Sequence, residues 1–326
     1  MDFNDIIGHD NIKNNLRNAI RNENVAHGYL FQGAKGIGKK RMALTFAKTL
    51  LCEKSEDNPC DTCPSCLKFE SKNHPDLIVE KPEGKSFKKE QIDNIQRDIR
   101  TFPYEGNKKI FILEDIDKMT KEAQNSFLKT LEEPPSYVVI IMTVINSYSL
   151  LPTIVSRSQL IKFNQIENSL IEYELKNKYN KDEKQARFIA SFSNGIMGKA
   201  LKLCESEEFK VLREDLIEII DDLINKEKFR VFTFSDFFEK NKENIDDIMD
   251  MMLIWFRDLL FMKEIVNEDL IINKDKISIL TNECQKIPKD KIHDIIKVVK
   301  RTKNDINKKV NFQLAIELML LKIQEV

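Results

Sequence analysis

The sequence predicts an α/β domain with a parallel sheet, followed by helical domains without strands. Three observations support this prediction. Short apolar, strand-like runs alternate with helix-like stretches as far as residue 165, which is typical of a parallel sheet covered on both faces. A glycine-rich turn follows the first of these runs and opens a helix, as in a phosphate-binding loop. From residue 166 onward, helical periodicity continues without another strand-like run.

These patterns place three domains along the chain. The strand-like runs are 27–31, 76–80, 108–115, 137–144 and 159–163, and helical patterns lie between them. We therefore expect a parallel-sheet domain over 1–165, a small helical domain over 166–206, and a helical bundle over 207–326. Because the last segment is long and carries no catalytic constellation, we expect it to serve oligomerisation. Its final helix is expected to start at Lys308.

The glycine-rich turn matches the phosphate-binding loop G-x-x-x-x-G-K-[ST] up to its last position. Gly33, Gly36 and Gly38 would let backbone N–H groups curl round phosphate oxygens, and Lys39 would reach the outer phosphates. The final hydroxyl should bind Mg²⁺, but Lys40 stands there, and an ammonium group cannot bind a metal ion. Binding of ATP and Mg²⁺ is therefore in doubt. The competing interpretation is a glycine turn that never meets a nucleotide.

Two further features belong to the same predicted site. Glu114 and Asp115 end a buried strand, where carboxylates normally handle Mg²⁺ and the attacking water. The usual order is Asp then Glu, so the two side-chain lengths are exchanged here. Arg157 lies in an exposed segment that precedes the last strand-like run. It is either a solvated surface charge or a phosphate-sensing group.

Four cysteines lie within fifteen residues, at Cys52, Cys60, Cys63 and Cys66. This spacing is typical of a tetrahedral thiolate site, and structural zinc is the preferred interpretation. An iron–sulfur cluster, a redox disulfide and four unrelated thiols are the alternatives. The cluster lies on an insertion between a helix and the next strand. Four thiolates would fill the coordination sphere, so a structural role fits better than a catalytic one.

Composition limits the classes of partner. The net charge is −1, so no overall basic field attracts nucleic acid, which counts against a zinc-dependent nucleic-acid-binding module. No apolar run is long enough to span a bilayer. The first residues lack the basic and apolar regions of a signal peptide, and we expect a cytoplasmic protein.

Taken together, these motifs resemble the AAA+ clamp-loader subunits of bacterial DNA polymerase III. The resemblance covers nearly the whole chain, and the combination of motifs is more specific than any one of them. The matching stretches are Asp5 to Gly8, His27 to Phe31, the glycine-rich loop, the four cysteines, Glu114 to Met119, Leu128 to Pro135, Leu151 to Arg157, and Gly195 to Leu201.

The resemblance implies a non-hydrolysing subunit of a pentameric loader that places the sliding clamp on primed DNA. Within the family's Ser-Arg-Cys motif, Arg157 would be an arginine finger that acts in trans on a neighbouring ATPase subunit, although Ser158 replaces the Cys. The family's second sensor arginine falls on Gly198 here. Residues 207–326 would form the collar. Partners would be gamma/tau and delta type subunits, the sliding clamp and primer-template DNA, within a DNA-directed DNA polymerase (nucleotidyltransferase) holoenzyme.

The alternative is a catalytically active AAA+ ATPase subunit of the same kind of complex, in which Mg²⁺ is held through water. Lys40, the exchanged Glu114 and Asp115, and Gly198 all depart from the active pattern in the same direction. The sequence therefore favours the subunit without intrinsic ATPase activity.

Overall fold

The structure is a computed structural model that describes residues 1–54, 57–225, 231–265 and 268–325. Positions 55 and 56 of the predicted zinc module, and 226–230, 266–267 and 326 of the predicted collar, lie outside the described residues. The chain divides into two compact units. The first comprises Met1–Leu170 and Gly195–Lys199, and the second Ile171–Asn194 and Ala200–Val326. None of the helices in the described ranges has the length and apolar character that a membrane span requires.

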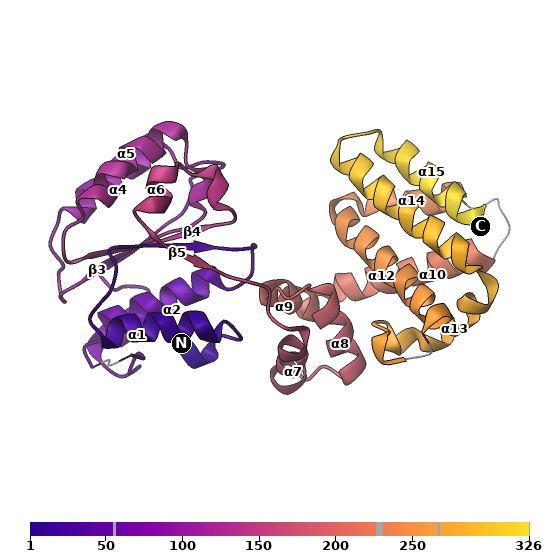
Figure 1. Cartoon of the computed structure of the whole chain (residues 1–326), viewed down its shortest axis with the longest axis horizontal. Helices are drawn as coiled ribbons and strands as arrows, with labels where there is room; N and C mark the ends of the chain where they lie inside the picture. The colour runs from indigo at the N-terminus through magenta and orange to yellow at the C-terminus, as the bar shows by residue number, and fades with distance from the viewer. Residues whose placement is uncertain (55–56, 226–230, 266–267, 326) are drawn as a thin grey trace. The chain divides into compact units, whose positions relative to one another are not determined.

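The first unit is built on a parallel five-stranded sheet with the order β2-β3-β4-β1-β5 (Figure 1). This confirms the predicted fold class. The strand bounds are β1 (Gly28–Gln32), β2 (Leu77–Glu80), β3 (Lys109–Leu113), β4 (Val138–Val144) and β5 (Gln159–Lys162). The strand expected over 108–115 ends at Leu113, because Asp115 has a left-handed backbone with a φ of 53°.

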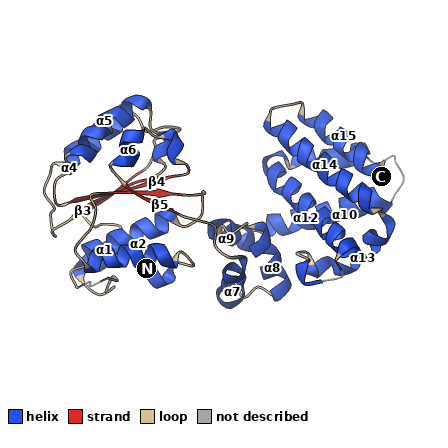
Figure 2. Ribbon diagram, in the orientation of Figure 1, coloured by secondary structure: helices blue, strands red, loops and turns tan. Residues whose placement is uncertain are grey.

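Helices cover both faces of this sheet (Figure 2). Tyr29 and Phe31 of β1 pack on one face with Phe46, while Leu30 packs on the other face with Phe127. This alternation follows from the two-residue period of a strand, and it explains the continuous apolar runs seen in the sequence. The first face carries η1 (Phe3–Asp5), α1 (Asp10–Arg21), α2 (Lys39–Leu51) and α3 (Pro64–Glu70), and the second α4 (Lys89–Ile99), α5 (Lys121–Glu132) and α6 (Pro152–Ser156).

The direction of the strands gives the sheet two different edges. The glycine-rich loop follows β1, Glu114 follows β3, and Asn146 follows β4, so all of these lie at the carboxyl edge. Gly28 begins β1 at the opposite edge, and Arg157 lies just before the start of β5. The short turns η2 (Ile116–Lys118) and η3 (Ser147–Ser149) complete this unit.

The second unit is helical in its described residues. In it, α12 (Ile245–Glu264) packs on α13 (Ile277–Lys286) and α14 (Lys289–Asn307), and α15 (Phe312–Gln324) packs on α10 (Glu207–Asn225), α11 (Val231–Lys240) and α14. The guanidinium of Arg213 on α10 pairs with both carboxylate oxygens of Asp275 at 2.7 and 2.8 Å, and lies 3.7 Å from the ring centre of Phe188 on α8 (Glu183–Phe192). This contact joins α8 to the C-terminal helices. The predicted boundary between 206 and 207 stays a prediction.

The other helices have the following bounds. Two are shared with the first unit, α7 (Asn168–Tyr179) and α9 (Met197–Glu205), and the rest are η4 (Lys242–Asn244), η5 (Glu268–Leu270) and η6 (Lys274–Lys276). The last helix therefore starts at Phe312. The expected start at Lys308 is wrong, because Lys308 caps α14 and Lys309 has a φ of 63°.

A buried carboxyl group lies in the core of this second unit. Trp255 is 2 % exposed, which makes it a core residue, and its Nε1 donates to Oε2 of Glu283 at 2.7 Å. Glu283 is fully buried, and its other oxygen has no partner within the described residues. Burial raises the pKa of Glu283 to about 7, with Asp221 raising it further and the Trp255 hydrogen bond and Lys286 opposing the rise. Glu283 is therefore largely protonated in the folded protein below neutral pH.

We expect the stability of this unit to fall between pH 4.5 and 7 because of Glu283. The folded state keeps the proton up to about pH 7, whereas an unfolded Glu loses it near 4.5, so the cost reaches about 3 kcal/mol above pH 7. Glu283→Gln removes this titration. Urea unfolding can be followed by the fluorescence of Trp255, the single tryptophan. The free energy of unfolding of the variant minus that of the wild type should be larger at pH 8 than at pH 5.

Exposed Glu218 on α10 supplies the matched control. Glu218→Gln should change stability equally at both pH values. A difference between Glu283→Gln and wild type that is the same at pH 5 and pH 8 would show that Glu283 is ionised throughout.

Candidate functional site

The glycine-rich loop has the backbone that its sequence predicts. Gly36 and Gly38 have φ values of 83° and 113°, which side chains rarely adopt, and Gly38 immediately precedes α2. At Gly33 a Cβ atom would come within 2.9 Å of Phe163. The N–H of Gly33 donates to the carbonyl of Val144 at 3.1 Å, which fixes the loop against β4. The turn therefore points the N-terminus of α2 toward the carboxyl edge of the sheet.

The lysine of the loop is turned back onto the loop itself. Its Nζ donates to the carbonyl oxygens of Gly33 at 2.6 Å and Ala34 at 3.0 Å, and the residue is 7 % exposed. Burial lowers the pKa of Lys39, although the charges of Asp115 and Asp117 favour its protonated form. The ammonium group that would contact phosphate oxygens is thus bound by the chain's own carbonyls.

A second segment closes on the same loop. The N–H of Gly198, in the first turn of α9, donates to the carbonyl of Gly36 at 2.9 Å. A Cβ atom on Gly198 would come within 2.7 Å of that oxygen and 3.0 Å of the Gly36 Cα. Real Cβ atoms are not found so close to backbone, so only glycine fits here. No side chain, and hence no sensor arginine, can start from this position without moving the loop.

The predicted metal position contains a cation of the chain. Lys40 lies in the first turn of α2, and its Nζ is 2.7 Å from Oε1 of Glu114. Asp115 points to Nζ of Lys118 at 2.9 Å, and its N–H donates to Oγ1 of Thr143. The acidic pair therefore meets lysines at the place where an active site would present it to a metal ion.

The structure separates Arg157 from these residues. Its carbonyl oxygen is 3.4 Å from the Cβ position of Gly28 at the start of β1, whereas Gly33 follows the end of that strand. Four residue steps of a strand span about 13 Å. Asn146, which follows β4 at the carboxyl edge, accepts a hydrogen bond from the N–H of Tyr148 and caps η3. Gly198 and the acidic pair are thus gathered round the loop, and Arg157 is not.

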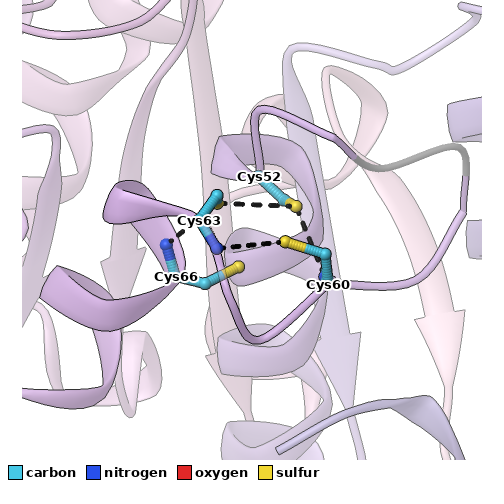
Figure 3. Close-up of side chains that lie close together, drawn as sticks. All are labelled: Cys52, Cys60, Cys63 and Cys66. Carbon is cyan, nitrogen blue, oxygen red and sulfur yellow. Dashed lines mark hydrogen bonds between the residues drawn. The ribbon is translucent and has the colours of Figure 1, made fainter.

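The four predicted cysteines come together at one point (Figure 3). Their Sγ atoms all lie within 4.8 Å of one another, and those of Cys52 and Cys63 are 3.9 Å apart. Four sulfur atoms at 2.3 Å from a tetrahedral Zn²⁺ would be about 3.8 Å apart. The cluster fits this geometry and could hold a metal ion.

Local hydrogen bonds suit the sulfur atoms to metal binding. The N–H groups of Cys60, Cys63 and Cys66 donate to the sulfurs of Cys52, Cys60 and Cys63 at 3.3–3.4 Å. Hydrogen bonds from Thr62 lower the pKa of the Cys60 thiol to about 6, which favours the thiolate that binds metal. Burial raises the pKa of the Cys52 and Cys66 thiols, so these two would need the charge of the metal ion to lose their protons.

Sequence reasoning missed the residue that fastens the cysteine module to the sheet domain. The side chain of Lys48 on α2 is fully buried, and its Nζ pairs with Asp61, between the second and third cysteines, and with Glu70 at the end of α3. Nothing in the helical pattern marks this lysine. The acidic residues Asp61 and Glu70, which flank Cys63 and Cys66, are the only sequence feature that could have pointed to a buried cation.

We expect Gly198→Ala to destabilise the first unit. Alanine normally stabilises a helix relative to glycine, so a loss would report the contact with Gly36 and not helix propensity. Overpacking against backbone costs about 1–3 kcal/mol, and in a domain of this size each kcal/mol lowers the melting temperature by roughly 2–4 °C. Thermal unfolding by circular dichroism measures this. Gly106→Ala is the control, since nothing lies within 4 Å of that Cβ position; equal melting temperatures would contradict the close approach.

Comparisons with known proteins identify the family. Residues 8–167 match the family model described as DNA polymerase III, delta subunit, and residues 207–325 match its C-terminal model. The chain is 32 % identical to DNA polymerase III subunit delta' of Bacillus subtilis, covering 95 % of this chain and 94 % of that protein. It is 24 % identical to subunit tau of the same organism, covering 98 % of this chain and 61 % of tau.

Among solved structures, the chain is similar to a gamma subunit-related protein of Thermotoga maritima. The TM-score is 0.40 and the identity 18 %, and the match covers 96 % of this chain and 98 % of that one. The two family models and the Bacillus subtilis relative between them account for both the sheet domain and the C-terminal helices. The chain therefore belongs to the DNA polymerase III delta subunit family, which confirms the resemblance that its sequence motifs indicate.

Proposed function

We propose that this chain is a non-hydrolysing subunit of a clamp-loader complex, in which Arg157 acts as an arginine finger on the ATP site of a neighbouring subunit. The observation that carries the proposal is the position of Arg157 at the sheet edge opposite its own glycine-rich loop. A guanidinium at that edge cannot reach a phosphate held by the loop. It can reach a phosphate presented by another chain that packs against that edge.

The chemistry of a guanidinium suits this role. It stays charged at every physiological pH, and its planar fork matches phosphate oxygens as negative charge builds in the transition state. The side chain of Arg157 is 36 % exposed, so a partner can contact it.

Three contacts support the absence of hydrolysis by this subunit. Lys39 is bonded to loop carbonyls, Lys40 pairs with Glu114, and Gly198 closes on Gly36. The first two contacts occupy groups that would otherwise meet nucleotide or metal, and the third leaves no room for a side chain at the sensor position. The competing proposal, an active ATPase that holds Mg²⁺ through water, requires Lys40 to leave Glu114. ATP turnover by the purified chain alone, at a rate on the order of 1 s⁻¹ and lost on Lys39→Ala, would favour the competing proposal.

The family suggests the remaining partners. We propose assembly with gamma/tau and delta type subunits through the helices of 207–326, and action on the sliding clamp and primer-template DNA through the complex. The cytoplasmic location expected from the sequence stays a prediction.

We further propose that the cysteine cluster holds one structural Zn²⁺. Cys52, Cys60, Cys63 and Cys66 would supply four thiolates and leave no position for a substrate. The metal would join the end of α2 to the start of α3, while Lys48 holds the same module through its ion pairs with Asp61 and Glu70.

One zinc per chain is expected by elemental analysis of the purified protein, and Cys63→Ser should lower this content and loosen the module. The sheet should stay folded, because its core is formed by other residues. Cys284→Ser, which changes a thiol outside the cluster, should keep the metal. Protein without metal, or with the brown absorbance of an iron–sulfur cluster, would contradict the zinc assignment.

Arg157→Ala should leave the complex assembled and slow hydrolysis at one of its ATP sites. Removing an arginine finger costs about 10³–10⁵ in rate at the site that receives it. The reconstituted complex with clamp and primed DNA is the sample, and single-turnover hydrolysis should resolve that site as a slow phase. Steady-state turnover should fall less, because other sites keep their own fingers. Unchanged kinetics in a complex that is intact by gel filtration would show that Arg157 is a solvated surface charge and not an arginine finger.

A further inference from the structure

The backbone of Arg157 is held in place by its surroundings. α6 ends at Ser156 and β5 begins at Gln159, so only two residues join them. The hydroxyl of Ser158 donates to the carbonyl of Ile154 at 2.9 Å, and the Arg157 carbonyl lies 3.4 Å from the Cβ position of Gly28. These contacts fix where the side chain starts. They do not fix where its guanidinium points, because several rotatable bonds lie between.

Two further contacts fix the guanidinium. Nη2 lies 2.8 Å from Oε1 of Glu132, and Nη1 donates to the carbonyl of Thr153 at 3.3 Å. A guanidinium has five N–H donors, so these contacts leave others for a phosphate. Glu132 is the last residue of α5, where the negative end of the helix dipole also favours a cation.

The helix end that carries Glu132 is held in place at its backbone. The preceding Leu131 is 1 % exposed and packs 3.7 Å from the Cβ position of Gly28, the same point that holds the Arg157 backbone. Pro134 and Pro135 end the helix just beyond. The backbones that carry the carboxylate and the guanidinium therefore rest on one corner, formed by the start of β1 and the ends of α5 and α6, and the ion pair joins the two side chains.

We propose that Glu132 is a positioning residue for Arg157, which holds the guanidinium in the orientation that meets the neighbouring subunit's nucleotide. This inference rests on the proposed finger role. An exposed ion pair such as this one contributes little to stability, so stability does not explain it. Orientation does, because a misplacement of about 1 Å can cost a reaction about 100-fold. Exclusion of water at a subunit interface also strengthens the pair.

The test uses the reconstituted complex with clamp and primed DNA, and variants of this subunit only. Glu132→Ala should slow the phase that Arg157→Ala slows, by about 10-fold, and Glu132→Gln by less, since its amide oxygen still accepts a hydrogen bond. The ATP concentration for half-maximal rate should change less than about twofold, because the neighbour's own loop binds the ground state. Glu133→Gln is the matched control, since this exposed carboxylate is adjacent in sequence and makes no ion pair with Arg157.

The double variant separates positioning from other effects. In an Arg157→Ala background, Glu132→Ala should have no further effect on the slow phase. Wild-type kinetics for Glu132→Ala beside a slowed Arg157→Ala would overturn the positioning role and leave the finger role intact. A loss that persists in the Arg157→Ala background would show that Glu132 acts through another group. If Arg157→Ala itself has wild-type kinetics, the proposed finger role fails and the inference fails with it.

Discussion

The common direction of the five strands is the constraint that places both the glycine-rich loop and Arg157. Parallel strands bring every β-to-α turn to one edge, and the glycine-rich loop, the acidic pair and Asn146 therefore lie there together. The same rule sends the α6–β5 junction, and Arg157 with it, to the other edge. No choice of rotamer can bring Arg157 back to its own loop. The distance between the glycine-rich loop and Arg157 is thus set by the topology of the sheet and not by a local side-chain conformation.

The departures from an active loop are physically coupled. On the proposed function, Lys40 in place of the metal-binding hydroxyl leaves the carboxylates without Mg²⁺, and the same lysine supplies a positive charge to Glu114. A glutamate reaches this ammonium with one methylene more than an aspartate has, which gives the exchanged order a use. Gly198 lacks a side chain where Gly36 approaches it. Two contacts therefore account for the three deviations in the sequence. One is the ion pair of Lys40 with Glu114, and the other is the close approach of Gly198 to Gly36.

The sequence was sufficient for the parts of the fold that repeat locally. Strand-like runs, the glycine turn and the clustering of four cysteines have signals of short range, and the structure contains all of them. Contacts between distant segments had no such signal. The approach of Gly198 to Gly36 spans 162 positions, and the pairing of Arg157 with Glu132 depends on where two helices end. The burial of Lys48 was equally hidden, because a lysine on a helix normally lies in water.

The proposed function also restricts where such a subunit can act in a complex. When chains pack head to tail, each offers one edge to one neighbour and the opposite edge to the next. On the proposed function, this chain gives Arg157 at one interface and offers no usable nucleotide at the other. It can therefore complete a neighbour's site without needing a neighbour to complete its own, which suits a terminal position in a series of ATP sites. On the same proposal, the internal contacts of Lys39, Lys40 and Gly198 stand where contacts with nucleotide and metal would, and they hold the glycine-rich loop in its shape.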